Sequence, residues 1–415
     1  MPTGLNTTEG RSPLHVAVAL DGAGWHPAAW RSDGARPGEL FTPQYWVDMV
    51  EESERGRLDF VTFEDSMALQ SARRGAADDR VDRVRGRLDA VLTAARVAPR
   101  TSRIGLLPVA TTTHTEPFHV SKAIATLDYV SAGRAGVQVR VSGTGLEARQ
   151  FGRRSIPDAV RNADGPADGS TVSSLAEELF DEAADFVEVV RRLWDSWEDD
   201  AEIRDVATGR FVDRDKLHYI DFEGRWFDVR GPSITPRPPQ GQPLVAVLAH
   251  VPVAFRLAAR CADLVFVTPQ HVGDLGGLLA GVRVVEEEAS RQGDPLLVFA
   301  DLLVFLDDEP GAAAARRAHL DGIDGRVHRS DAAIVTGTPA EVADLIVDWH
   351  AEGVDGIRLR PAVLPHDLES ITRRLVPLLE ERGVFRADDG TGSLRSRLGL
   401  DRPANRYTIA GRSAS

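Results

Sequence analysis

The sequence predicts a closed parallel (β/α)8 TIM barrel with insertions, and two observations favour it. Eight short β-prone apolar runs begin near residues 14, 60, 104, 137, 244, 264, 296 and 356, and segments with helical periodicity separate nearly all of them. The competing fold, an open doubly wound sheet, normally carries a glycine-rich phosphate fingerprint after its first strand. Segment 21–25, DGAGW, matches that fingerprint only weakly, so the barrel is favoured.

The first half of the chain alternates strands and helices from the first apolar run onward. Residues 14–20 read LHVAVAL, a buried strand that ends at the turn residues of 21–24. In the following helix, 42–56, Trp46, Met49 and Val50 recur at helical spacing, and Gly56 is a stop residue. The same reasoning predicts a strand at 60–63, a helix at 90–97, a strand at 104–109, a helix at 120–130 and a strand at 137–141.

The second half opens with the clearest amphipathic helix, 175–197, whose apolar residues recur at intervals of three and four. Residues 217–229 alternate around Glu223-Gly224 and predict a β-hairpin outside the barrel, with its GRW segment packed against that long helix. The remaining predicted elements are strand 244–248, helix 253–262, strand 264–267, helix 273–292, strand 296–306, helix 339–352, strand 356–359 and helix 367–382.

The domain organisation follows from these elements. We expect a flexible tail at 1–13, a single barrel domain at 14–382, and a C-terminal extension at 383–415 that packs on the barrel. Within the barrel domain, the polar insertion 153–173 is expected to be a mobile lid whose sequence carries no readable specificity.

Composition and charge exclude several classes of protein. Hydrophobic residues make up 42% and charged residues 27%, which excludes disordered and fibrous chains. The sequence has 49 Lys and Arg residues and 63 Asp and Glu residues, a net charge of −14, and it has no long basic run. This charge disfavours nucleic acid and anionic membranes as partners.

The longest apolar run, 296–306, contains Asp301 and is too short to span a bilayer. A single cysteine, Cys261, permits neither an internal disulfide nor a cysteine-built zinc site, so we expect a cytoplasmic protein without a metal.

Polar residues that follow the predicted strands are the candidate site residues, because active sites of parallel barrels lie at the carboxyl ends of the strands. We expect them to converge on one cavity. The candidates for catalysis are His26, Trp30 and His114, and those for cofactor binding are Asp65, Thr112, Thr113, Gln138, Arg140, Ser142 and His250.

Each candidate also has a purely structural interpretation. Trp30 could pack a loop, His26 could cap a turn, Asp65 could cap the next helix, and the threonines could hydrogen-bond the backbone. The sequence lacks the HExxH, GxSxG, P-loop and EF-hand patterns, so no acid–base dyad or metal motif decides between these interpretations.

Five segments carry a resemblance to a known family. They are DFVTFEDS (59–66), TEPFHVSKAIATLDYVSAGRAG (115–136), ADFVEVVRRLWDSWEDDA (184–201), DFEGRWFDVRGPSITPRPPQGQP (221–243) and SLRSRLGLDRPANRY (393–407). In these segments the chain resembles the bacterial luciferase-like flavin monooxygenases, in the branch of the nitrilotriacetate and dibenzothiophene-sulfone monooxygenases. The resemblance runs from about residue 14 to residue 407.

The resemblance implies a TIM-barrel oxidoreductase that binds reduced flavin mononucleotide (FMNH2) delivered by a separate flavin reductase. Dioxygen would add to the flavin to give a C4a-hydroperoxide, which would insert one oxygen atom into a small organic substrate. The family also implies a homo-oligomer, either a dimer or a tetramer. Asp65 and the hydroxyls of Thr111, Thr112 and Thr113 match positions that line the flavin ring in the family.

The chain departs from the family at three places that bind the flavin. Gln138 stands where an asparagine usually contacts the ring, and Leu179-Phe180 stands where an Arg-Tyr pair usually opens the long helix near the phosphate. His250 lies in VLAHV (247–251), where the family commonly has Gln-Ala-Gly-Ser-Ser, so Arg140 would have to supply compensating charge. These departures leave two alternatives open: an oxidoreductase that uses the deazaflavin F420, and a catalytically silent relative that binds a ligand.

Overall fold

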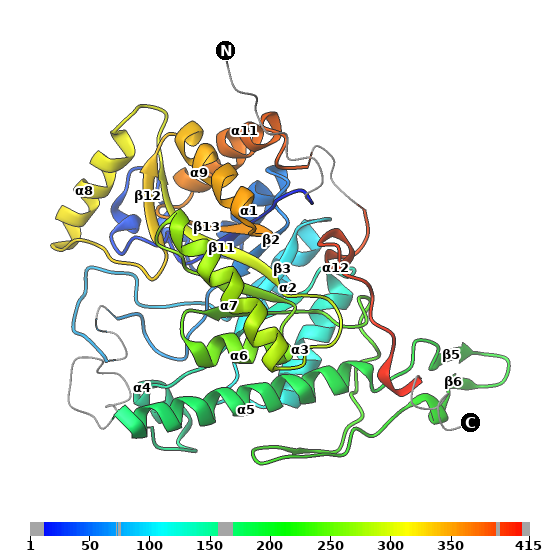
Figure 1. The fold of residues 1–415 in the computed structure, drawn as a ribbon. Coiled ribbons are helices and arrows are strands. Elements are labelled where there is room, and N and C mark those ends of the chain that lie inside the picture. The colour runs from blue at the N-terminus through cyan, green and yellow to red at the C-terminus, as the bar shows by residue number, and fades with distance from the viewer. Residues whose placement is uncertain (1–11, 72, 74–75, 157–168, 387–390, 409–415) are drawn as a thin grey trace.

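Eight parallel strands close into a barrel in the computed structural model, which describes residues 12–71, 73, 76–156, 169–386 and 391–408 (Figure 1). The strands pair in the order β1-β2-β3-β4-β9-β10-β11-β13, and β13 returns to β1. This architecture confirms the predicted TIM barrel. The eight strands are β1 His15–Leu20, β2 Phe60–Phe63, β3 Gly105–Thr111, β4 Gly136–Arg140, β9 Leu244–Ala249, β10 Leu264–Val267, β11 Leu297–Leu306 and β13 Gly356–Pro361.

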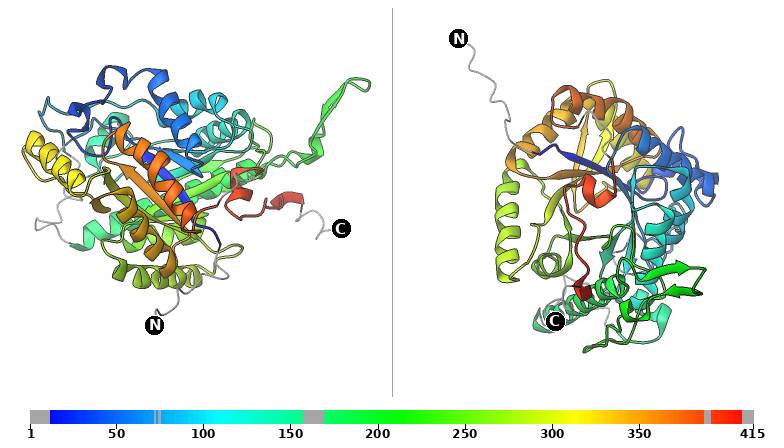
Figure 2. Two further views of the ribbon diagram at one scale, coloured as in Figure 1. Left: turned by 90° about the horizontal axis from the view of Figure 1, so that it is seen from above. Right: turned by 90° about the vertical axis from the view of Figure 1, so that its right-hand side faces the viewer.

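Helices cover the outside of the barrel and bury their apolar faces against the strands (Figures 1 and 2). Local sequence fixes where they begin: Thr338 and Glu341, for example, form a capping box at the start of α9. The predicted helix 367–382 contains a π-helical turn at Ile371–Leu375 between α10 and α11. The bounds are α1 Pro43–Arg55, α2 Ala90–Val97, α3 Pro117–Val130, α5 Gly169–Asp195, α6 Pro252–Cys261, α7 Leu275–Glu288, α9 Pro339–Glu352, α10 His366–Ser370 and α11 Val376–Glu381.

Several elements escaped the sequence-based prediction. A ninth strand, β12 (Ala333–Gly337), pairs with the second half of β11, while the first half of β11 pairs with β10. Ten residues make β11 long enough to serve both neighbours. The other missed elements are α4 Gly145–Phe151, α8 Ala312–Asp324 and the hairpin of β5 Glu202–Asp205 and β6 Arg210–Val212, which extends away from the barrel (Figure 2). Their sequences are short, polar or rich in alanine, so periodicity gave little indication of them.

The hairpin expected at 217–229 is shorter than predicted and lies outside the barrel sheet. Its strands are β7 Phe222–Glu223 and β8 Asp228–Val229, which pair in antiparallel register. The hairpin contacts α5 chiefly through Phe222 and Phe227, and the Phe227 ring centroid lies 5.8 Å from that of Phe186. Within the GRW segment, the Arg225 guanidinium covers the Trp226 ring and forms an ion pair with Glu178 of α5. The core of the expected lid, 157–168, lies outside the described residues.

The amino end of the barrel is filled by an apolar layer. Leu394, from the short helix α12 (Leu394–Arg397), is fully buried there and belongs to one cluster with Phe60, Leu107, Leu244 and Phe299. The carboxyl end of the barrel is therefore the open end. Within the part of the chain that the structure describes, no helix has the length and apolar character needed to cross a membrane.

Gly356 lies where the barrel interior leaves no room for a side chain. A Cβ atom at this position would lie 2.3 Å from Cε1 of Phe299. We expect Gly356→Ala to lower the free energy of unfolding by about 1–3 kcal/mol, because overpacking forces the neighbouring ring and backbone to shift. Urea denaturation measures the loss. The control is Gly281→Ala in α7, which meets nothing within 4 Å and should be neutral or stabilising; equal effects would contradict the prediction.

Candidate functional site

A cavity of about 450 Å³ opens at the carboxyl end of the barrel. Its wall comes from three connections: the loop after β1, the long loop between β2 and α2, and the start of α4 after β4. A volume of this size is typical of small-molecule sites. The lining includes Trp25, His26, Trp30, Arg73, Arg83, Arg87, Arg140, Asp21 and Glu147. Of the ten predicted site residues, His26, Trp30 and Arg140 therefore line this cavity.

The loop after β1 is held rigidly by hydrogen bonds from its own rings. Trp25 Nε1 donates to the Ala19 carbonyl at 2.7 Å, and Trp30 Nε1 donates to the Asp82 carbonyl at 3.1 Å. His26 Nε2 lies 3.2 Å from a carboxylate oxygen of Asp321, and its Nδ1 accepts from the amide of Ala28 at 3.1 Å. Burial lowers the pKa of His26, so the ring is neutral and both of its nitrogens are engaged. In this arrangement His26 fixes the shape of the wall.

Ion pairs of three arginines anchor the β2–α2 loop beside the cavity. Arg83 pairs with Asp324 at the end of α8, and Arg87 pairs with Asp21 after β1 at 2.7 Å. Arg80 also donates to Asp324 at 3.1 Å. The loop thus bridges two distant parts of the barrel mouth and forms one side of the cavity.

Three of the predicted cofactor-binding residues bond the backbone in this structure. Thr112 Oγ1 donates to the Arg140 carbonyl at 3.3 Å, and Thr113 Oγ1 accepts from the Ser142 amide at 2.8 Å. Asp65 accepts from the amides of Ser66 at 2.7 Å and Ala90 at 3.1 Å, which ties it to the start of α2. Burial raises the pKa of Asp65. These contacts match the structural interpretation of the three residues.

Arg140 provides a fixed charge at the end of β4. It forms a bidentate ion pair with Glu147 at 2.8 and 3.0 Å and donates to Thr111 Oγ1 at 2.9 Å. Burial opposes ionisation of Glu147, but the hydrogen bonds and charge of Arg140 prevail and lower its pKa to about 2. Both charges are therefore present at neutral pH.

One buried polar atom near this ion pair, Nε2 of His114 after β3, lacks a hydrogen-bond partner among the described residues. The His114 ring stacks on Phe151 with centroids 5.1 Å apart, and burial lowers its pKa. Ser142, after β4, is also buried, and its hydroxyl helps to lower the pKa of Glu147. Buried polar groups are normally satisfied, so His114 Nε2 is a candidate for a hydrogen bond to a bound ligand.

The interior of the barrel below the cavity holds a charge network that sequence reasoning missed. The Asp301 carboxylate accepts from Arg358 Nε at 2.8 Å and from Arg360 Nε at 2.9 Å, and all three side chains are fully buried. Arg358 Nη1 also donates to Oε1 of Gln138 at 2.6 Å, so Gln138 faces the barrel interior. The guanidinium of Arg360 lies 4.5 Å from the Trp25 ring centroid, which links the network to the cavity wall.

The sequence contained two indications of this network. Asp301 interrupts an otherwise apolar run, and two arginines alternate with Ile357 and Leu359 at the period of a strand. Charged residues at every second position of a buried strand all point to the same side.

The region expected to hold a flavin phosphate has few polar donors. His250 is exposed on the turn between β9 and α6, and the N-cap of α6, Val251, makes no side-chain capping bond. Leu179 of α5 is buried against Ala148 and Ile156. Apolar packing therefore stands at Leu179, and exposed side chains stand at positions 250 and 251.

Comparison with known proteins identifies the family. The model of the luciferase-like monooxygenases matches residues 23–329. The chain belongs to this family. The resemblance stated from the sequence is thereby confirmed, and the chain is an enzyme of the monooxygenase type.

Relatives of this luciferase-like chain extend over nearly its whole length. It is 32% identical to nitrilotriacetate monooxygenase component A of Aminobacter aminovorans, over 94% of this chain and 97% of that protein. It is 28% identical to the N-acetyl-S-(2-succino)cysteine monooxygenase of Bacillus subtilis (strain 168), over 96% and 99%. The fold is similar to that of riboflavin lyase, solved with modified FMN and riboflavin, with a TM-score of 0.82 at 23% identity over 97% of this chain and 99% of that one.

Asp301 should be indispensable for stability because its removal leaves two buried guanidinium groups without their shared counter-charge. We expect Asp301→Ala to lower the free energy of unfolding by about 3–5 kcal/mol. Chemical denaturation measures this loss. Asp181→Ala, which breaks the exposed pair with Arg260, is the control and should cost less than about 1 kcal/mol. Similar losses in the two variants would show that the buried network is not a stabilising element.

Proposed function

We propose that the chain is the oxygenase component of a two-component FMNH2-dependent monooxygenase, which inserts one oxygen atom from O2 into a small organic substrate. The observation that carries the proposal is the 450 Å³ cavity at the barrel mouth of a luciferase-like chain. The name of the nitrilotriacetate relative, a component A, supports a partner protein, for which we propose a flavin reductase. A homo-oligomer is part of the same proposal.

The residues around the cavity fit a flavin ring. Trp25 and Trp30 in the cavity wall supply apolar surface that excludes water. His114 Nε2, buried without a partner behind the Arg140–Glu147 pair, can hydrogen-bond a heterocycle that reaches it. Arg140, fixed by Glu147, places a positive charge in the cavity wall. When bound, the reduced flavin would supply the two electrons and activate dioxygen, and the protein would position the reactants.

The phosphate end of the flavin has weaker support. An exposed His250 and an apolar Val251 stand at the turn before α6, and the described side chains of that turn include no hydroxyl. Weak binding suits a cofactor that arrives reduced from a reductase and leaves after each turnover. F420 stays the alternative cofactor, because this turn offers few groups that would hold the phosphate of FMN.

Titration of the purified protein with FMN, FMNH2 and F420 under anaerobic conditions separates these functions. The proposal predicts binding of FMNH2 that is tighter than that of FMN, together with consumption of O2 when the FMNH2 complex meets air. Selective binding of F420 would point to hydride transfer, and the absence of binding by all three would contradict the proposed function.

We expect the purified protein to be colourless, because its weak phosphate contacts do not retain oxidised FMN. The double substitution of His250 and Val251 by serine would add two hydroxyl donors, each contributing about 0.5–1.5 kcal/mol. FMN affinity should then rise by roughly 5-fold to 100-fold, as measured by quenching of flavin fluorescence.

Val206→Ser, in the exposed turn between β5 and β6, is the control and should leave the affinity unchanged. A yellow protein as isolated, or an unaltered affinity in the double variant, would show that the phosphate binds elsewhere, with Arg140 the first residue to test.

A further inference from the structure

Glu64 lies inside the barrel mouth, at the end of β2. Alternation along this strand places Phe60 in the apolar interior cluster and Thr62 beside Arg358, whose Nη1 donates to Thr62 Oγ1 at 3.3 Å. Glu64 is two residues further on and therefore faces the same interior, one layer nearer to the mouth. Its amide donates to the Leu20 carbonyl at 3.1 Å, which continues the β1–β2 pairing and fixes its backbone.

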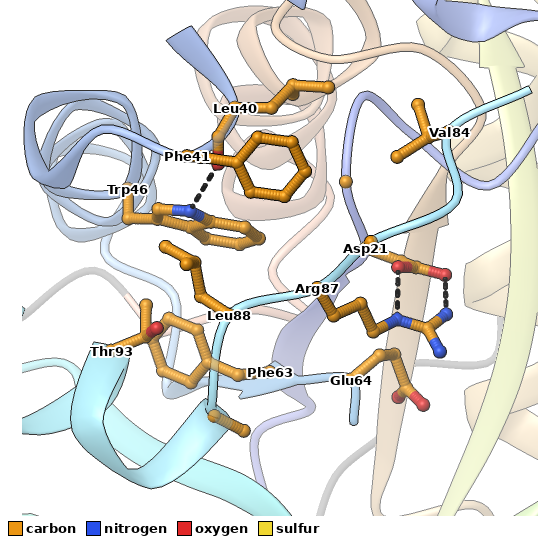
Figure 3. Close-up of a pocket in the computed structure, with 13 residues that line it drawn as sticks. Asp21, Leu40, Phe41, Trp46, Phe63, Glu64, Val84, Arg87, Leu88 and Thr93 are labelled. Atoms are coloured by element: carbon orange, nitrogen blue, oxygen red, sulfur yellow. Dashed lines mark hydrogen bonds and ion pairs between the residues drawn. The ribbon is translucent and has the colours of Figure 1, made fainter. Parts of the chain in front are cut away.

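The charged neighbours of Glu64 in this layer are all paired with other groups. Asp21 pairs with Arg87, Arg358 pairs with Asp301, and Arg360 bonds Asp301 and Asp331. The Glu64 carboxyl, in contrast, makes no hydrogen bond or ion pair to any other residue of the described ranges. Figure 3 shows it beside the Asp21–Arg87 pair.

A small cavity beside Glu64 adjoins the candidate site. It has a volume of about 20 Å³, enough for one water molecule, and its lining includes Phe63, Glu64 and Trp46 (Figure 3). Asp21, Gly22, Val84 and Arg87 line both this cavity and the 450 Å³ cavity. The Asp21–Arg87 pair and its neighbours therefore lie between Glu64 and a ligand in the larger space.

Burial of the carboxyl raises the pKa of Glu64, and the charge of Asp21 acts in the same direction. Arg358, Arg360 and Arg87 act in the opposite direction but do not reverse the shift. A carboxyl with these properties can carry a proton closer to neutral pH than an ordinary glutamic acid.

We propose that Glu64 is a proton-relay residue of this enzyme, which passes a proton through the small cavity to the oxygen atom that leaves as water. The proposal rests on the proposed function. The balanced reaction for a substrate S is S + O2 + FMNH2 → SO + FMN + H2O.

In this reaction the O–O bond breaks, one oxygen atom forms a bond to S, and the other becomes water. O2 is reduced by four electrons, two from S and two from the reduced flavin. The two hydrogens of the water come from FMNH2, and Glu64 carries one of them: it gives its proton to the departing oxygen and regains a proton from the flavin, so that it ends each turnover unchanged.

The protein without cofactor gives the first test, through Glu64→Gln. Because the folded chain holds this proton more tightly than the unfolded chain, the wild-type protein should lose stability as pH rises from the ordinary glutamate pKa of about 4.3 through the raised value. The glutamine variant has no ionisable group at this position, so it does not lose stability in this way. Its Tm should therefore exceed that of the wild type at neutral pH, by a margin that shrinks as the pH falls toward 4.3.

Glu223→Gln, on the exposed strand β7, is the matched control and should show no such pH-dependent difference. A Glu64→Gln variant that is less stable than the wild type at neutral pH would show that an ionised Glu64 is held by the arginines. That result would overturn the proposal.

The second test mixes the anaerobic FMNH2 complex with O2 and measures the rate at which oxidised FMN appears, as a function of pH. Glu64→Gln should lower the rate by about 100-fold or more and remove the pH dependence assigned to this carboxyl, while Glu64→Asp should restore the dependence in part. Affinity for FMNH2, measured anaerobically, should be nearly the same in the wild type and Glu64→Gln.

The two possible failures are distinguishable. If the wild type binds FMNH2 and Glu64→Gln keeps both its rate and its pH profile, the proton relay alone is wrong. If the wild type binds no reduced flavin, the proposed function is wrong and the relay is wrong with it.

Discussion

The Asp301 carboxylate is the group on which the interior of this barrel depends. Two guanidinium groups, Arg358 and Arg360, enter the closed barrel from one strand, and both are fully buried. A buried charge without a partner costs several kcal/mol, a large share of the 5–15 kcal/mol by which a typical domain is stable. Asp301, on the adjacent strand, is the counter-charge that both share, and Asp331 supplies a second negative charge to Arg360. Arg358 also fixes the orientation of Gln138.

This network also sets the conditions at the mouth of the barrel. Arg360 reaches Asp331 on one side and the Trp25 ring on the other, so the network supports one wall of the cavity through Trp25. Arg140 and Glu147 form a second fixed pair on the opposite connection. Preorganised charges of this kind are one of the largest contributions that a protein can make to catalysis.

The sequence predicted the barrel well because each of its eight strands is a separate β-prone apolar run. It did not predict β12, where only a few apolar residues occur and the partner is the far end of an unusually long strand.

For the site, the rule that polar residues follow barrel strands correctly selected three residues of the cavity wall, His26, Trp30 and Arg140. It could not distinguish them from Asp65 or Thr113, which do not line the cavity, because that distinction depends on side-chain direction. The roles of Arg358 and Arg360 were not predicted, because their shared counter-charge, Asp301, lies on another strand and only the pairing of the two strands brings the three residues together.

The apolar layer that fills the amino end of the barrel has a consequence for how the chain folds. Leu394 packs against Phe60 and Leu107, residues from strands that leave the ribosome far earlier. When all eight barrel strands of a nascent chain have been synthesised, the apolar layer at the amino end of the barrel still lacks Leu394, because α12 has not yet emerged. Until then this layer is exposed hydrophobic surface, which favours binding by chaperones and association between incomplete chains. The order of synthesis thus makes completion of this apolar layer one of the last events in the folding of the barrel.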